Sequence, residues 1–273
     1  EASKAYVMSL FMKDNDFAIF RSRDLMHWEQ SDSFTLQDAW ECPDLFLLTS
    51  ETGENCWFFW SADGFYYQGD FDGYRFHTDG VKHCAYINRI AYAAQTYAGI
   101  KDRVISVPWL RLPNDGRTFT GAYGIPVELS CKKTSKGFAL LQKPVRELKE
   151  HAEKMESGAL ERVSGQIVCQ TKRDKKAVLI EMHMKDTAQE PYIWKINKSL
   201  VEYTPESGTF AVDGEAWQTC TGCREFLFLI DDRILEVFFD GGVQTGAFVL
   251  REKDMAFETA REAVADYAAY EIM

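Results

Sequence analysis

The sequence predicts an all-β chain in which a β-propeller is followed by a β-sandwich. Short runs rich in Tyr, Phe, Trp and Val recur along the 273 residues, and Gly, Asp and Asn separate them. Runs of this kind at regular spacing are typical of strands in sandwiches, barrels and propellers. Their grouping into units of three to four strands in the first half favours a propeller there.

The predicted propeller occupies residues 1–144. Its strand-like runs are short, and turn signals built from Gly, Asp and Asn lie between them. The runs lie at 5–12, 16–23, 26–34, 44–50, 55–62, 65–71, 91–99, 103–112, 122–131 and 137–145.

A charged stretch separates the two predicted domains. Residues 145–158 read VRELKEHAEKMESG, and their helical spacing and closing glycine predict a short linker helix. Strand-like runs resume in residues 159–273, which we expect to form the sandwich. Within it, residues 229–242, LIDDRILEVFFDGG, predict a hairpin, because two β-rich runs flank Asp-Asp-Arg and end at Gly-Gly.

The composition is typical of a globular chain and limits the kinds of partner that it can bind. Hydrophobic residues make up 46% and aromatic residues 14% of the chain, enough for a sizeable core. The formal net charge of −11 argues against a nucleic-acid partner, since little here would neutralise phosphates. No run of 18 apolar residues is present, which argues against a membrane-spanning helix.

The seven cysteines predict neither a disulfide framework nor a metal site. The closest pair is Cys220 and Cys223, and no second C-x-x-C or neighbouring pair of histidines completes a zinc site. Scattered thiols in odd number favour a reducing compartment, so a cytoplasmic location is favoured over secretion. The chain starts at Glu1 without methionine and reaches a strand-like run by residue 5, so we expect that a segment upstream of it is missing.

The stretch QDAWECPDLFLL, residues 37–48, is the first candidate for chemistry. A carboxylic acid that donates a proton at neutral pH needs a raised pKa, which burial beside an aromatic side chain can supply. Trp40 would provide that apolar wall for Glu41, and Pro43 would fix the turn. Spacing alone leaves open the simpler reading that Glu41 only ends a strand at the surface.

Aromatic residues on later strands form the second candidate. Tyr92, Gln95 and Trp109 lie near the ends of two neighbouring predicted strands. A tryptophan face is a natural platform for the apolar face of a sugar, with phenol and amide groups to bind hydroxyls. The alternative is an aromatic core. A third stretch, Gly69 to Gly73 (GDFDG), is predicted to be a tight polar turn, with too few oxygen ligands for a calcium loop.

Taken in order, these stretches resemble glycoside hydrolase family 32, the invertase, levanase and inulinase group. The resemblance covers about residues 5–270, and its acid/base motif is WECPDLF at 40–46. The later landmarks are YYQGDFDGYRF at 66–76, AYAAQTY at 91–97, DRVISVPWL at 102–110, GIPVELS at 124–130 with LLQKPVREL at 140–148, and the hairpin at 229–242.

Members of that family join a five-bladed propeller to a sandwich and hydrolyse β-fructosidic bonds with retention. The resemblance thus implies a partial five-bladed propeller, with about three blades in residues 1–144. It implies that Glu41 is the general acid/base and that no metal or cofactor takes part. It also implies a fructose-containing saccharide, such as sucrose, levan or inulin, as ligand, bound by Trp40, Cys42, Asp44, Tyr92, Gln95 and Trp109.

Two motifs of the family are absent. Its aspartate nucleophile lies in an Asn-Asp-Pro-Asn-Gly stretch, but here Asn114-Asp115 is followed by Gly116. Its Arg-Asp-Pro motif has no match either, since Arg23-Asp24 is followed by leucine. The chain is therefore expected to lack about two blades and to be inactive alone. Its open strand edges would be covered by a missing N-terminal propeller segment or by a second copy of the chain.

Three hypotheses follow from the sequence. The first is a β-fructosidase seen as its C-terminal portion. The second is a non-catalytic carbohydrate-binding or interaction protein derived from the family, and the third is a degenerate product without a function of its own. The sequence leaves open the substrate linkage and chain length, exo or endo action, hydrolysis or fructosyl transfer, and the oligomeric state.

Overall fold

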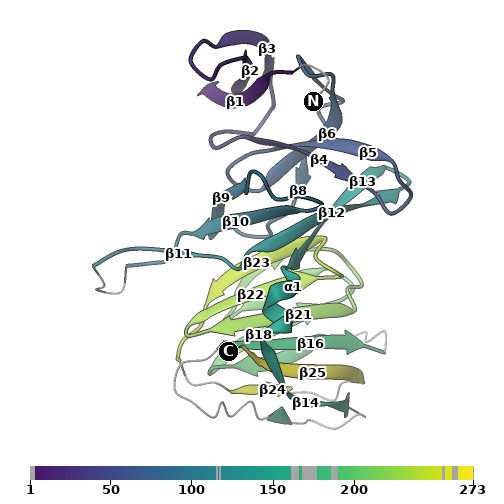
Figure 1. Cartoon of the computed structure of the whole chain (residues 1–273). Helices are drawn as coiled ribbons and strands as arrows, with labels where there is room; N and C mark the ends of the chain where they lie inside the picture. The colour runs from purple at the N-terminus through teal and green to yellow at the C-terminus, as the bar shows by residue number, and fades with distance from the viewer. Residues whose placement is uncertain are drawn as a thin grey trace. The chain divides into compact units, whose positions relative to one another are not determined.

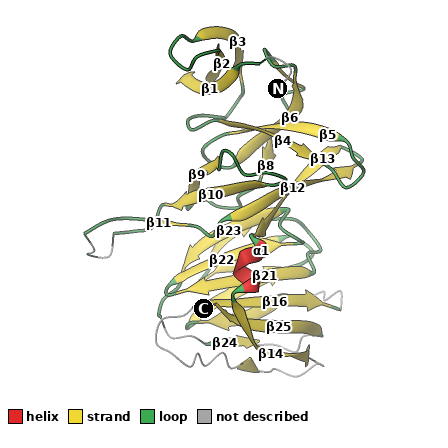
Figure 2. Ribbon diagram, viewed as in Figure 1, coloured by secondary structure: helices red, strands yellow, loops and turns green. Residues whose placement is uncertain are grey.

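In the described part of the chain almost every regular element is a strand, and these strands form five antiparallel sheets (Figures 1 and 2). The computed structural model describes residues 4–114, 116, 118–160, 166–167, 177–185, 190–253, 256–259 and 264–272. The chain divides into two units, residues 1–141 and residues 142–273. Within the described ranges, no helix has the length and apolar character needed to cross a membrane.

Three sheets build the first unit, one after another along the chain. The first has the order β1-β2-β3, the second β4-β5-β6-β7 with β8 also on β6, and the third β11-β10-β12-β13 with β9 also on β10. Small antiparallel sheets in succession are propeller blades, so the prediction of about three blades is confirmed. The strands are β1 (Tyr6–Lys13), β2 (Asp16–Ser22), β3 (Glu29–Thr35), β4 (Asp44–Thr49), β5 (Asn55–Trp60), β6 (Phe65–Phe71), β7 (Phe76–Thr78), β8 (His83–Cys84), β9 (Ala91–Thr96), β10 (Val104–Leu110), β11 (Ala122–Tyr123), β12 (Val127–Thr134) and β13 (Gly137–Pro144).

An aromatic cluster joins the first two blades. Phe17 of β2 and Phe59 of β5 are fully buried, with ring centroids 5.0 Å apart in an edge-to-face arrangement. Leu36 and Ala39 pack in the same cluster, and Tyr67 donates a hydrogen bond of 2.7 Å to the carbonyl of Gln37. These contacts fix the segment that leads directly to Glu41.

Two local predictions need correction. The helix α1 covers only Arg146–Glu150, and β14 (Ala152–Leu160) then pairs with β25 (Ala265–Ile272), so the linker helix predicted over 145–158 is wrong in its second half. A partner strand more than a hundred residues away outweighs the local helix propensity. The polar turn expected at Gly69–Gly73 is also displaced, because β6 continues to Phe71 and the chain turns after it.

The second unit contains two six-stranded sheets, which confirms the sandwich. Their orders are β14-β25-β16-β21-β22-β23 and β15-β24-β17-β18-β19-β20. Because β14 belongs to the first of them, the sandwich includes residues before 159. The strands not yet placed are β15 (Gln166–Ile167), β16 (Val178–Met184), β17 (Tyr192–Ile196), β18 (Ser199–Thr204), β19 (Thr209–Val212), β20 (Glu215–Gln218), β21 (Glu225–Asp231), β22 (Ile234–Phe239), β23 (Gln244–Val249) and β24 (Phe257–Thr259).

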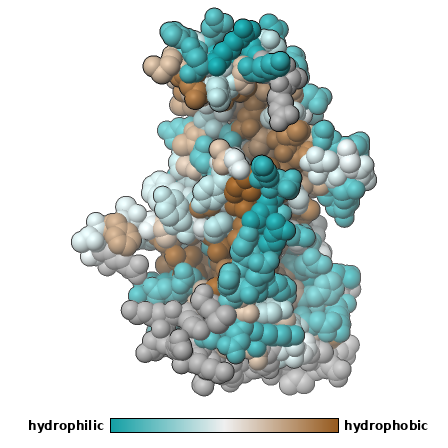
Figure 3. All heavy atoms as spheres, viewed as in Figure 1, coloured by the Kyte–Doolittle hydropathy of each residue, from teal (hydrophilic) through white to brown (hydrophobic). Residues whose placement is uncertain are grey.

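The sandwich core is aromatic, and its hairpin is the predicted one. Phe226 of β21 packs against Trp194 of β17 at 5.2 Å and against Tyr203 of β18 at 5.1 Å between ring centroids. Strands β21 and β22 pair from Phe226↔Phe239 to Asp231↔Ile234, as expected for residues 229–242. Figure 3 shows hydrophilic residues over most of the visible surface, with hydrophobic residues in the recesses.

Candidate functional site

The turn that carries Glu41 has a strained backbone. Glu41 and Cys42 both have positive φ, 51° and 42°. Such a conformation costs of order 1–3 kcal/mol for a residue other than glycine and persists where the surroundings impose it. Here the amide of Ala62 donates to the carbonyls of Trp40 and Glu41, both at 3.2 Å, and the Gln95 side chain donates to the carbonyl of Cys42 at 3.0 Å.

Tyr92 of β9 donates a hydrogen bond from its hydroxyl to Oε2 of Glu41. The carboxylate is otherwise exposed, so it is held from one side and open to solvent on the other. Burial, together with this hydrogen bond and the charge of Glu41, raises the pKa of Tyr92 to about 12. Tyr92 therefore stays protonated around neutral pH and keeps the orientation of the Glu41 side chain.

Trp109 of β10 lies beside Tyr92. The two residues are paired across β9 and β10, with ring centroids 6.3 Å apart and an interplanar angle of 74°. Trp109 is 40% exposed, which fits a platform better than a core residue. On its other side β11 places Tyr123, which is 82% exposed and which the sequence did not single out.

Two charged residues that the sequence did not single out, Arg111 and Asp63, lie next to Tyr92. The guanidinium carbon of Arg111 lies 3.9 Å from the centre of the Tyr92 ring, a cation–π contact. Its Nη2 lies 3.3 Å from Oδ1 of Asp63, which is buried, and the side chain also donates to the carbonyl of Arg89. No spacing along the chain signals this group, since its members come from three separate segments.

Asp44 forms hydrogen bonds to the backbone, and the environment of Cys42 changes the pKa of its thiol. Oδ2 of Asp44 accepts a hydrogen bond of 2.7 Å from the amide of Thr96, and Oδ1 accepts one of 2.8 Å from Leu45. Burial raises the pKa of Asp44, and these hydrogen bonds offset part of the effect. The pKa of the Cys42 thiol is raised by burial and by the charge of Glu41, which argues against a thiolate nucleophile here.

The structure thus brings the sequence-predicted residues to one region of the first unit. Trp40 flanks the turn with its ring 6.0 Å from the guanidinium carbon of Arg89. Among the described residues, the Glu41 side chain interacts with Tyr92 and Cys42, and neither supplies a second carboxyl group. The arrangement can present the carboxyl group of Glu41 beside an exposed indole.

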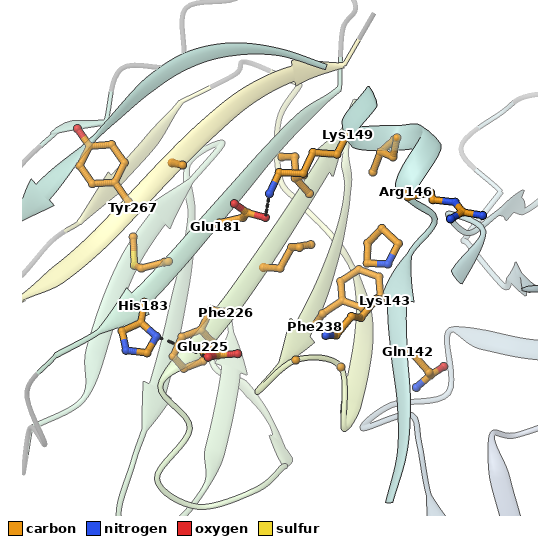
Figure 4. A pocket seen from close by; sticks show the side chains of 18 of the residues that line it. Gln142, Lys143, Arg146, Lys149, Glu181, His183, Glu225, Phe226, Phe238 and Tyr267 are labelled. Atoms are coloured by element: carbon orange, nitrogen blue, oxygen red, sulfur yellow. Dashed lines mark hydrogen bonds and ion pairs between the residues drawn. The ribbon is translucent and has the colours of Figure 1, made fainter. Parts of the chain in front are cut away.

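A groove of about 850 Å³ lies in the second unit and is lined by residues of that unit (Figure 4). It follows the sheet face of β16, β21 and β25 under the segment 142–150. Four of the titratable side chains that line it pair with one another: Lys149 with Glu181 at 2.7 Å and His183 with Glu225 at 3.7 Å. The groove therefore carries no obvious reactive group, and chemistry rather than volume identifies the candidate site.

Known proteins resemble this chain in sequence and in fold. Residues 1–144 match the model of the glycosyl hydrolases family 32 N-terminal domain. A levanase from Bacillus subtilis (strain 168) is 29% identical over 176 residues, which are 54% of this chain and 26% of the levanase.

Two solved structures show the same fold. The exo-inulinase from Aspergillus awamori has a TM-score of 0.83 at 16% identity, over 99% of this chain and 65% of the inulinase. A fructofuranosidase variant from Schwanniomyces occidentalis, complexed with fructosylnystose, has a TM-score of 0.77 at 15% identity, over 99% of this chain and 68% of that one. The chain therefore spans about a quarter of the levanase and under two thirds of the inulinase.

Proposed function

The chain belongs to glycosyl hydrolase family 32, and on that premise we propose that it is the C-terminal portion of a β-fructosidase acting on sucrose or fructans. The observation that carries this proposal is the Glu41 carboxyl group, presented on a strained turn, held by Tyr92 and open to solvent beside Trp109. In this role Glu41 protonates the leaving oxygen of a β-fructosidic bond and then activates water.

The surrounding residues take distinct roles in the proposal. Trp109 stacks on the apolar face of the sugar, and Tyr92 orients Glu41. Asp44 and Gln95 position the turn, since Asp44 binds the backbone of β9 and Gln95 binds the backbone of Cys42. Trp40 and Cys42 border the bound saccharide.

Hydrolysis with retention requires a second carboxyl group about 5–5.5 Å from the first. Because the described contacts of Glu41 include none, we propose that the nucleophile comes from residues outside these 273, or from a second copy of the chain. Among the described strands, β1 is one of the two edge strands of the first sheet, and Tyr6, Val7, Leu10 and Met12 on it are exposed. Such an edge can accept one more strand from either source.

Fructose release from sucrose, levan and inulin tests the proposal. We expect this chain alone to give little turnover, and a longer chain of the same protein to give turnover that Glu41→Gln lowers by about 10²–10⁴-fold. Glu51→Gln, the same exchange on an exposed turn, should leave the rate unchanged. Robust turnover by this chain alone that Glu41→Gln abolishes would show that the catalytic set is complete within these 273 residues.

The exposed pair Trp109 and Tyr123 also fits a second function, carbohydrate binding without hydrolysis. Calorimetric titration with fructo-oligosaccharides distinguishes the two. If Trp109→Ala removes binding and the control Trp28→Ala, a matched exchange in the first blade, does not, Trp109 is supported as the sugar platform. If a longer chain also binds but never releases fructose, the binding function replaces the enzymatic one.

A further inference from the structure

Two turns meet at one end of a sandwich sheet. The loop Cys220-Thr221-Gly222-Cys223 lies between β20 and β21, and Asp240 follows β22. Because Phe226 of β21 pairs with Phe239 of β22, the start of one strand and the end of the other are adjacent. Both Sγ atoms and a carboxylate oxygen of Asp240 lie within 4.8 Å of one another.

We propose that Cys220, Cys223 and Asp240 form a binding site for a zinc ion. Thiolate sulfur and carboxylate oxygen are ligands that zinc accepts, at about 2.3 Å and 2.0–2.2 Å. A tetrahedral ion with these bond lengths needs ligand atoms about 3.5–3.8 Å apart, so small side-chain rotations suffice. Three protein ligands leave a fourth position for water.

The carboxylate is held in place by its surroundings. Oδ1 of Asp240 accepts hydrogen bonds from the amides of Arg224 at 2.8 Å and Glu225 at 3.0 Å. No described residue forms a hydrogen bond or ion pair with Oδ2, so that oxygen is available to a cation. Hydrogen bonds that fix one oxygen of a ligating carboxylate are typical of metal sites.

The cysteine loop is fixed as well. The Tyr203 hydroxyl donates to the carbonyl of Cys220 and accepts from the amide of Cys223, both at 2.8 Å. The amide of Gly222 donates to the carbonyl of Pro205 at 2.9 Å. Cys223 is buried, whereas Cys220 and Asp240 are half-buried, so an ion would enter from one side.

A bound cation explains why two cysteines and an aspartate lie together better than a disulfide does. A bond between Cys220 and Cys223 would use the sulfur atoms alone and give the nearby carboxylate no part. Zinc would bind both sulfur atoms as thiolates, with release of their protons, and would engage the carboxylate of Asp240 as well. The disulfide is therefore the competing outcome of the test.

The test uses the full chain, reduced with a phosphine that is then removed. Zinc is titrated against a chromophoric chelator, and cobalt serves as a spectroscopic probe through its sulfur-to-cobalt charge-transfer absorption. We expect one ion per chain, loss of the cobalt band in Cys220→Ser, and binding at least about tenfold weaker in Asp240→Asn. Cys84→Ser, which changes a cysteine of the first unit, should bind as the wild type does.

Asp240→Asn removes one proposed ligand without disturbing the fold. Asparagine tolerates the left-handed backbone at this position, φ 43°, and its Oδ1 still accepts from Arg224 and Glu225. The fold should survive, which circular dichroism checks, even if Cys220→Ser unfolds. Absence of stoichiometric binding, equal affinity in Asp240→Asn, or a thiol count showing a Cys220–Cys223 disulfide that re-forms with zinc present would each overturn the proposal.

Discussion

Replacing Asp44 by asparagine tests whether this residue anchors the Glu41 turn. Its carboxylate accepts two short backbone hydrogen bonds, 2.7 Å from Thr96 and 2.8 Å from Leu45. Asparagine keeps one acceptor oxygen but presents an NH2 group to the second amide, so one of the two hydrogen bonds is lost at a cost of about 1–3 kcal/mol. Relief of the carboxylate's desolvation offsets part of the loss. We expect Asp44→Asn to lower the free energy of unfolding by about 1–3 kcal/mol, and Asp44→Ala by about 2–4 kcal/mol.

Urea denaturation followed by circular dichroism and tryptophan fluorescence measures these changes. Asp70→Asn is the matched control, because Asp70 is an exposed aspartate of the same unit whose side chain forms no hydrogen bond with any residue that the structure describes. It should change stability by no more than about 0.5 kcal/mol. If Asp44→Asn costs no more than Asp70→Asn, the two hydrogen bonds do not anchor the turn, and the positioning role is refuted.

The pH dependence of the same pair gives an independent check. Burial raises the pKa of Asp44 above its ordinary value of 3.8, so the folded chain holds this proton more tightly than the unfolded chain. The stability that this contributes is fully present below the unfolded pKa and is lost as the pH rises through the folded pKa. The wild type should therefore lose stability relative to Asp44→Asn as the pH rises above about 4. The opposite slope would contradict burial as the main cause.

Three further outcomes follow from the structure. In an alkaline absorbance titration, Tyr92→Phe should lack one tyrosine that titrates near pH 12 in the wild type. Glu41→Gln should lower the pKa of Tyr92 only in part, because burial is the largest cause of its raised value. Phe17→Ala should cost about 3–5 kcal/mol in urea denaturation because Phe17 is fully buried, whereas Phe119→Ala, at a 67% exposed position, should change little. Tyr203→Phe should cost about 1–3 kcal/mol and weaken zinc binding about 10–100-fold, because its hydroxyl bridges the backbone of the cysteine loop; unchanged affinity would separate that hydroxyl from the site.

The strands of both units could be read from local pattern. Runs such as residues 55–60 and 225–231 are rich in aromatic or large aliphatic residues and have turn signals at both ends, and they form β5 and β21. The prediction of a helix over 145–158 was wrong in its second half. The charges and spacing of this stretch suit a helix, but β14 forms because it pairs with β25 at the other end of the unit. Local sequence does not contain that partner.

The sequence by itself determined the all-β class, the order of blades and sandwich, and the candidate Glu41 with Tyr92, Gln95 and Trp109. The class depends on composition and spacing, whereas the Glu41 site was implied by the resemblance of short motifs to a known family; all of these are local properties of the chain. Only the tertiary structure placed Arg111 and Asp63 behind Tyr92, and Asp240 beside Cys220. Those groups are assembled by strand pairing and turn geometry between segments distant in sequence, and no local pattern encodes such an encounter.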